Sequence, residues 1–284
     1  MKSRIAFLIT TLALMSTGRA LAQDRTATIG AAANARVSIY NPTGSVKVEA
    51  WDRPEVSVIA GRGSFRDLDL LTDDPKHITV RARTGFSIEV HVPRGVQLNV
   101  ECGSGSIDIS GVQGSVEAES QSGSLQIEGR PRSITANGIS GGVTILGGGT
   151  EITHAESVSG SVVITDAHGV VDAKSSSGSV NVNGRVRDAK LFSVSGDVVF
   201  KGTVENGGRL SAESSSAGVE LYLPANTSAD YELSTVSGDI DNDFGPPATH
   251  TRNGSGVTLR FSVAGGGARV KAATVSGSVK LAAH

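Results

Sequence analysis

The sequence has few of the residues that stabilise most exported or globular folds. Cys102 is the only cysteine in 284 residues, so an intramolecular disulfide framework is excluded and folding must rest on packing and hydrogen bonds. Aromatic residues make up only 4% of the chain. A core would therefore consist of Val, Ile, Leu and Ala, and such small side chains suit a narrow interior. Cys102 alternates in step with Leu98 and Val100, which predicts a thiol that points inward as a small buried hydrophobe.

Long hydrophobic runs are also missing. After the first 22 residues no stretch approaches the roughly 20 apolar residues of a membrane-spanning helix. The start has a positive charge, an apolar run over residues 5–15 and small residues at Ala20 and Ala22, which together predict a signal peptide over residues 1–22. Its removal would change the net charge from −2 to −5. We expect an exported protein, periplasmic or extracellular and at the cell surface, with no nucleic-acid partner, because nucleic acids reward basic patches.

Glycine is abundant instead, at 36 of 284 residues, and much of it belongs to a repeat. The dipeptide Ser-Gly recurs with a mean spacing of 18.2 residues between Gly105 and Gly196. A second Gly-containing turn stands about halfway along each unit, as at Gly111–Gly114 and Gly129–Pro131. One repeat therefore holds two short strands and two turns.

Between the turns, apolar and polar residues alternate, which indicates strands with one buried face. Ile127 and Ile145 are two of the residues that we expect to point inward. Short strands with one apolar face cannot bury it alone, but stacking successive repeats in register does so. The sequence thus predicts an all-β fold, a right-handed β-solenoid (β-helix) of roughly 18-residue two-strand coils.

The glycines at the sharp corners are expected to provide positive φ angles, which other residues adopt only with strain. The serine beside each of these glycines is expected to hydrogen-bond the backbone of the turn.

The chain is expected to have three parts: the signal peptide over 1–22, an N-terminal β cap region over 23–100, and the solenoid with irregular C-terminal coils over 101–284. Near the end, a loop over 242–256 is followed by predicted strands that close the C-terminal end, at residues 256–263, 268–273 and 278–281.

Several segments, in this order, resemble the bacterial adhesin-like family of unknown function with β-strand repeats, which is similar to autotransporter-adhesin head domains. They are Asn41–Val46, Trp51–Val56, Val92–Gly95, the Ser-Gly repeats, Leu223–Ala225 and Leu233–Ile240. The resemblance covers nearly all of the mature chain. It implies a β-solenoid at the cell envelope, without established catalytic residues.

Candidate sites are few. The pattern G-x-S-x-G at Gly138–Gly142 falls inside the repeat, where a nucleophile elbow has no strand-to-helix turn to stand on. None of the six histidines stands in an H-x-H or H-x-x-x-H pair, so we predict no catalytic residues, no cofactor and no transition-metal site.

Two weaker candidates are left. Asp239, Asp241 and Asp243 alternate on one side of a predicted strand, where they could share a calcium ion or form a solvated acidic edge. Trp51, the only tryptophan, could anchor a sugar or a partner, or could pack within the cap region.

These observations favour a non-enzymatic exported envelope protein, an adhesin-like β-solenoid for binding or scaffolding. Its partner would be an envelope protein, a glycan or another cell-wall polymer, held by many Ser, Thr, Asn and Asp side chains. A polysaccharide-acting β-helix enzyme is the alternative from another class, although the short predicted turns leave little room for a cleft. A soluble periplasmic partner of a membrane-bound regulator is the third interpretation.

Overall fold

The computed structural model describes residues 25–61, 67–147, 151–248 and 256–284. The predicted signal peptide, residues 1–22, lies outside the described residues. Within the described ranges the chain forms 23 strands and no helix, so the prediction of an all-β fold is confirmed. No helix long and apolar enough to cross a membrane occurs among these residues.

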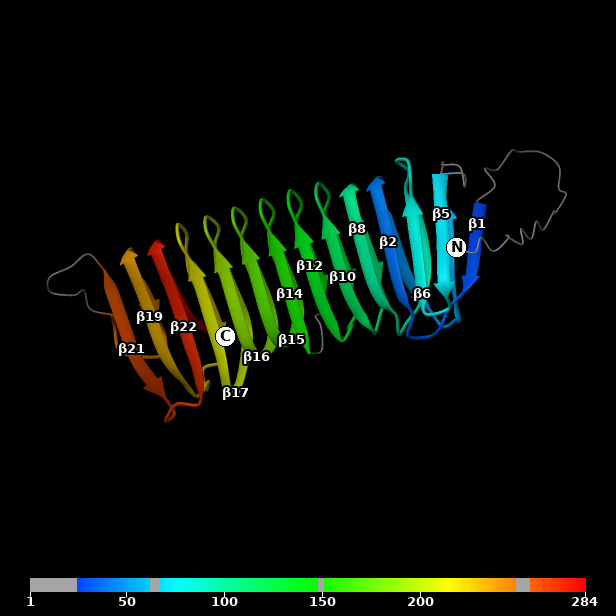
Figure 1. Cartoon of the computed structure of the whole chain (residues 1–284). Coiled ribbons are helices and arrows are strands. Elements are labelled where there is room, and N and C mark those ends of the chain that lie inside the picture. The colour runs from blue at the N-terminus through cyan, green and yellow to red at the C-terminus, as the bar shows by residue number, and fades with distance from the viewer. Residues whose placement is uncertain (1–24, 62–66, 148–150, 249–255) are drawn as a thin grey trace, which may run out of the picture.

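The strands build two long faces, which Figure 1 shows one in front of the other. The front face, called face I, consists of thirteen strands or parts of strands in spatial order: β5 (Leu68–Asp74), β6 (His77–Ala82), β2 (Arg36–Thr43), β8 (Gln97–Ser104), β10 (Ser115–Ser120), β12 (Ser133–Gly138), β14 (Ile152–Ser157), the second parts of β15 (Val162–Ser175), β16 (Val180–Ser193) and β17 (Val198–Ser214), then β22 (Ala268–Ser276), β19 (Ala229–Ser237) and β21 (Val257–Val263).

The opposite face, called face II, has a matching order: β1 (Arg25–Gly30), β4 (Glu55–Ala60), β7 (Ile88–Pro93), β3 (Val46–Trp51), β9 (Ile107–Ser110), β11 (Leu125–Glu128), β13 (Val143–Leu146), the first parts of β15, β16 and β17, then β18 (Val219–Leu223), β23 (Val279–Ala283) and β20 (Ile240–Asn242). Because β15, β16 and β17 run through both faces, the strands form one continuous sheet.

Neighbouring strands pair in parallel, except at the ends, where β1, β4, β5 and β21 pair antiparallel. Along face I, Val116 pairs with Leu98 on one side and with Ile134 on the other. Along face II, Ile127 pairs with Ile109 and Ile145. Equivalent positions of the repeat therefore lie side by side, which is the arrangement of a solenoid.

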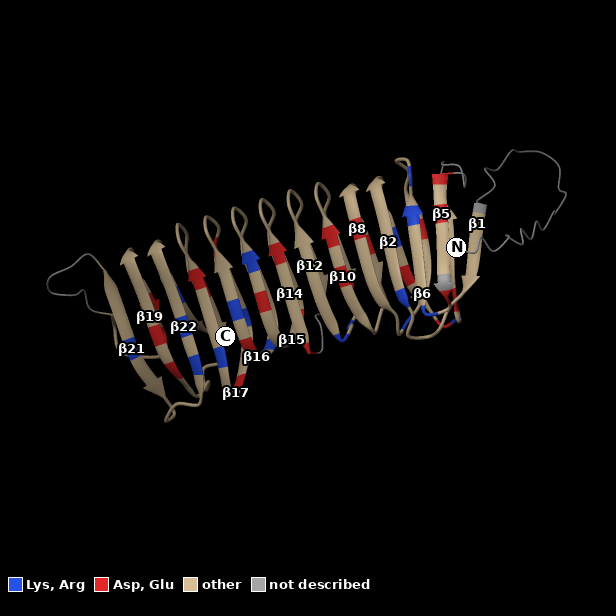
Figure 2. Cartoon of the chain, in the orientation of Figure 1, with Lys and Arg blue, Asp and Glu red and all other residues tan. Residues whose placement is uncertain are grey.

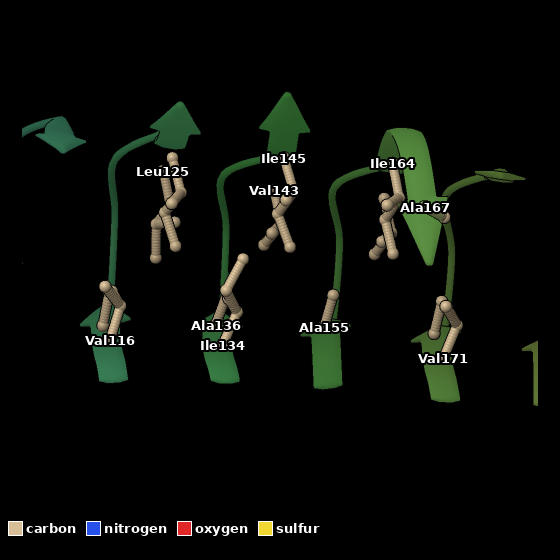
Figure 3. Packing of buried hydrophobic residues seen from close by; sticks show 14 of the residues in the cluster. Val116, Leu125, Ile134, Ala136, Val143, Ile145, Ala155, Ile164, Ala167 and Val171 are labelled. Atoms are coloured by element: carbon tan, nitrogen blue, oxygen red, sulfur yellow. The ribbon is translucent and has the colours of Figure 1, made fainter. Parts of the chain in front are cut away.

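The core is a thin layer between the faces. Charged and uncharged residues alternate along the strands (Figure 2), and the inward uncharged side chains of face I and face II meet in the middle (Figure 3). Ile127 is 1% exposed and Ile145 is fully buried, so the predicted inward parity is confirmed for both. Cys102 is buried as well. Nearly all of the large buried side chains are Ile, Leu or Val, as the shortage of aromatic residues requires.

The order of the coils in space departs from their order in the chain at both ends. The first coil, β2 with β3, lies between the coil of β6 and β7 and the coil of β8 and β9. The last coil, β22 with β23, lies between the coil of β17 and β18 and the coil of β19 and β20. The prediction that the strands at 268–273 and 278–281 close the C-terminal end is therefore wrong, because an earlier coil pairs outside them. Only β21 stands at that end of face I.

Positive φ angles occur, as predicted, at glycines of the turns that join face II to face I, such as Gly111 and Gly129. Most of the Ser-Gly corners differ from this prediction. Gly105 and Gly238 have positive φ angles of 144° and 157°. At five other Ser-Gly corners φ does not lie between +20° and +160°: Gly123, Gly141, Gly160, Gly178 and Gly196. At these positions a Cβ atom would fall on the backbone of the corner one coil earlier; at Gly178, for example, it would overlap the carbonyl of Gly160. Close stacking of the coils, not backbone conformation, is what requires glycine there.

Candidate functional site

One edge of the solenoid joins the ends of face I strands to face II, and outside the β6–β7 connection, which contains Arg83, it carries almost no charge. We call it the Ser-Gly edge; it comprises residues 42–45, 103–106, 121–124, 139–142, 158–161, 176–179, 194–197, 215–218, 275–278 and 236–239. Asp197 and Asp239 are its only charged residues. In Figure 2 this edge is the row of mostly uncharged loops above the arrowheads of β10 to β17, with Asp197 in the loop after β16.

Apolar side chains stand in a row along this edge. Five of them are between 41% and 52% exposed, in spatial order Ile139, Val158, Val194, Val275 and Val236. Backbone hydrogen bonds fix their stacking: Ser159 N donates to the Ile139 carbonyl at 2.9 Å, and Ser177 N donates to the Val158 carbonyl at 3.0 Å. Ser176 and Ser215 occupy the remaining places in the row.

Buried hydroxyl groups hold the corners in place beneath this row. Ser175 Oγ donates to the carbonyl of Gly160 in the preceding coil and accepts from Gly178 N in its own coil, both at 2.9 Å. Ser157 and Ser193 make the same pair of bonds in their coils. The hydroxyl that bonds the corner thus belongs to the residue three positions before the glycine, whereas the sequence suggested the serine beside it.

Cys102 occupies this same position in its coil. It pairs with Ser120 on one side and Asn41 on the other, and its thiol lies 3.4 Å from the carbonyl of Gly44. Burial raises the pKa of the Cys102 thiol, which keeps it protonated as a weak hydrogen-bond donor. The lone cysteine is therefore part of the buried ladder of corner residues.

The opposite edge, which joins face II to face I, is rich in arginine. We call it the Arg edge; it comprises residues 93–96, 111–114, 129–132, 166–169, 184–187 and 202–208. Its arginines pair with acids on the same edge or beside it: Arg94–Asp52, Arg130–Asp166, Arg132–Glu151, Arg185–Glu205 and Arg187–Asp188. The hydrogen bond from Arg94 holds the pKa of Asp52 below its usual value. The charged groups of this edge are occupied with one another.

Trp51 ends β3 and is half-buried. Its ring stacks on His91 with centroids 4.9 Å apart, the Arg53 guanidinium lies 4.8 Å from its centroid, and its Nε1 donates to the Glu55 carbonyl at 2.9 Å. These contacts fasten the turn between β3 and β4. They also occupy the ring that we considered as an anchor for a sugar or a partner.

Beside Trp51, Glu49, Glu89 and His91 bring ligand atoms within 4.8 Å of one another, and this is the one such group of three among the described residues. Sequence spacing could not reveal it, because the residues come from two strands, β3 and β7, that are far apart in the chain. Lys47 Nζ lies 2.5 Å from a Glu49 oxygen and 3.4 Å from a Glu89 oxygen. Its hydrogen bond lowers the pKa of Glu49. The lysine ammonium thus already neutralises these carboxylates, so the group forms an ion-pair cluster.

Asp239, Asp241 and Asp243 are exposed at the outer edge of β20. Asp243 accepts a hydrogen bond from Ala283 N at 3.3 Å. The three carboxylates do not form a group of close ligand atoms in the described structure. Calcium binding at these residues stays a prediction.

Solved structures that align with most of this chain share little sequence with it. A candidate lipid-binding protein of Parabacteroides distasonis has 12% identity, a TM-score of 0.41, and alignment over 92% of this chain and 97% of that chain. A candidate adhesin of Parabacteroides merdae has 9% identity and a TM-score of 0.35, over 92% and 97%. A candidate adhesin of Bacteroides fragilis has 9% identity and a TM-score of 0.32, over 92% and 98%.

Among curated proteins, none matches this chain in sequence. The model of one protein family matches residues 67–282, which is more than half of the chain and includes most coils of both faces. The chain belongs to the Toastrack DUF4097 family.

Proposed function

We propose that this protein is a non-enzymatic, exported β-solenoid that binds or scaffolds a partner of the bacterial envelope. The proposal includes right-handed winding with one coil for each Ser-Gly repeat, cleavage of a signal peptide over 1–22, a cap region over 23–100 and a solenoid over 101–284. It places the mature protein in the periplasm or at the cell surface.

The Ser-Gly edge carries this proposal. Single exposed apolar residues are ordinary on a protein surface, but a contiguous apolar patch marks an interaction site. Here five β-branched side chains are aligned along one edge, with Ser176 and Ser215 between them and without Lys or Arg in the row. Their backbone is fixed by hydrogen bonds to both neighbouring coils, so binding would cost little ordering of the chain.

The partner that fits this edge is an envelope protein with a complementary apolar strip. The other surfaces are less suited to such a contact, since the arginines of the Arg edge are paired with acids and face I carries many charged side chains. Adjacent positions in the row are spaced by about 4.8 Å, the distance between neighbouring strands, which gives the edge a regular repeat that a partner can follow.

Photo-crosslinking in cells of the source organism tests this proposal. The reactive side chain would replace Val158 or Val194 on the Ser-Gly edge, and Gln126 or Asn181 on the outward side of face II would serve as matched controls. We expect one envelope protein to be captured from Val158 and Val194 but not from the controls. Capture from Gln126 and Asn181 alone, or from no position, would contradict binding through this edge.

A variant complements the crosslinking. Val158→Lys together with Val194→Lys introduces charge on exposed positions, so it should leave folding intact and abolish capture of the partner. Unchanged capture by a folded double variant would show that the apolar row is not the contact.

A further inference from the structure

A groove of about 640 Å³ lies on the outward side of face I, near its C-terminal end. Three consecutive residues of each of β17, β22, β19 and β21 line it. Its charged lining consists of four cations and two acids: Arg209, Arg269, Lys271, Arg260, Asp230 and Glu232. In a chain whose overall net charge is −2, this is a local excess of positive charge.

The acids around the groove already have partners. Their contacts are Glu232 with Arg260 at 2.6 Å, Glu213 with Lys271 at 2.8 Å, Asp230 with the Ser262 hydroxyl at 2.6 Å, and Asp188 with Arg187 at 3.0 Å. Two of the four cations in the lining have no acidic partner among the described residues. Among the described residues, no Asp or Glu oxygen lies within 4.0 Å of a side-chain nitrogen of Arg209 or Arg269.

Arg209 and Arg269 stand directly beside each other. They are register partners on the parallel strands β17 and β22, and both side chains are exposed. Like charges opposite each other on neighbouring strands destabilise a sheet. Figure 2 shows Lys and Arg on these neighbouring strands. An anion held between the two guanidinium groups would remove this repulsion and would supply the acceptors that both groups lack.

We propose that this groove binds an acidic polysaccharide, with a carboxylate of the sugar chain between Arg209 and Arg269. Guanidinium groups recognise carboxylates through paired, charge-assisted hydrogen bonds. Asp230, Glu232 and Ser211 lie beside them in the lining and can bond sugar hydroxyls. The groove is separate from the Ser-Gly edge, so this proposal can be tested independently of the function proposed above.

The pattern of charge favours a polysaccharide over other polyanions. Along the row of register partners the order is Asp188, Arg209, Arg269, Asp230. Acids on both sides of the arginine pair would repel nucleic acid, whose phosphates follow one another closely along the duplex. They suit a polymer in which single carboxylates are separated by neutral hydroxyl groups. None of the exposed large hydrophobic side chains among the described residues lines the groove, so insertion into a bilayer has no apolar anchor there.

Binding measurements on the mature protein test the proposal. Polygalacturonate, alginate and hyaluronate would be the acidic probes, dextran the neutral control, and phosphatidylglycerol vesicles the lipid control. We expect the wild-type protein to bind at least one acidic polysaccharide, not dextran, and the dissociation constant to rise roughly tenfold or more in Arg209→Gln/Arg269→Gln, since hydrogen bonds to charged groups are the strong ones. Arg36→Gln is the matched control, because Arg36 is exposed on the same face and its side chain bonds Gln97.

Each other result would overturn the proposal. These results are failure to bind all three acidic polysaccharides at low salt, equal binding by the double variant, or binding to the vesicles alone. A second readout keeps folding apart from binding. Because the arginines repel each other without ligand, the double variant should unfold at the same temperature as the wild type or higher. A clearly lower unfolding temperature would instead give the pair a structural role.

Discussion

The two edges of the solenoid are built by the same coils and enclose the same core, yet different contacts stabilise them. At the Ser-Gly edge, glycines allow each corner to press on the one before it, and buried hydroxyls bond both coils. At the Arg edge, exposed arginines pair with acids. The first edge is held by backbone contact and the second by side chains at the surface.

Variation in coil length falls on the Arg edge. Before that edge Val180 pairs with Val198, and after it Asp188 pairs with Arg209, so β17 holds more residues than β16 between these two pairings. The irregularities in the pairing of β15, β16 and β17 lie at Ile164/Ala167, Gly169/Val170 and Val186/Asp188, on this edge or beside it. The Ser-Gly edge therefore sets the spacing of the coils, and the Arg edge absorbs insertions.

The largest effect is expected from one added methyl group. Gly178→Ala would place a Cβ on the carbonyl of Gly160, which cannot move without separating two coils. We expect a loss of about 3 kcal/mol of folding free energy, at the upper end for overpacking. Gly207→Ala is the control on the Arg edge, where nothing lies within 4 Å and only its positive φ of 77° costs about 1 kcal/mol. Denaturant unfolding measures both, and equal losses would refute the difference between the edges.

The buried hydroxyls should come next. Ser175→Ala removes the acceptor for Gly178 N and the donor to the Gly160 carbonyl, leaving both backbone groups without a partner in the protein. Unsatisfied buried groups cost about 1–3 kcal/mol, so we expect a loss of about 2 kcal/mol. Ser176→Ala, one residue later and exposed, should change stability by less than about 0.5 kcal/mol. If the two alanine variants unfold together, the ladder does not stabilise the corners.

Part of the fold could be predicted from the sequence. Alternation identified the inward residues, including Ile127 and Ile145, because a period of two leaves only one apolar side for each strand. The Ser-Gly repeat located the corners. The motif S-x-S-G also contains the buried serine, but the serine next to the glycine is the usual turn residue, so the sequence favours that one.

Features that depend on which coils become neighbours could not be predicted. The chain order says nothing of β2 inserting between β6 and β8, or of β22 inserting between β17 and β19. For the same reason Glu49 and His91 were not expected to meet. The juxtaposition of Arg209 and Arg269, which are distant in the chain, was likewise invisible, because it exists only through the inserted last coil.

A smaller effect is expected on the Arg edge itself. Arg185 Nε lies 3.2 Å from a Glu205 oxygen; the Arg185 side chain is largely exposed and that of Glu205 is partly exposed. Exposed ion pairs contribute about 0–1 kcal/mol, so a double-mutant cycle with Arg185→Ala and Glu205→Ala should give a coupling energy within about 1 kcal/mol. Salt at about 1 M shortens the Debye length to about 3 Å and should remove the coupling. A coupling energy that is larger, or that salt leaves unchanged, would mean that this edge is not held by surface charge.

The smallest expected difference is one of pH dependence. The hydrogen bond from Arg94 lowers the pKa of Asp52 from its usual value of 3.8, so the folded state favours the ionised carboxylate. This contribution to stability is present above pH 3.8 and is lost as the pH falls through the lower pKa of the folded state. The difference in folding free energy between Asp52→Asn and the wild type should therefore shrink as the solution is acidified below pH 3.8.

Ser175→Ala, on the Ser-Gly edge, should differ from the wild type by the same folding free energy at every pH, because a hydroxyl does not titrate in this range. Unfolding midpoints measured between about pH 2 and pH 7 compare the three proteins. A gap for Ser175→Ala that varies with pH would tie the Ser-Gly edge to ionised groups and end the distinction between a backbone-held edge and a charge-held edge.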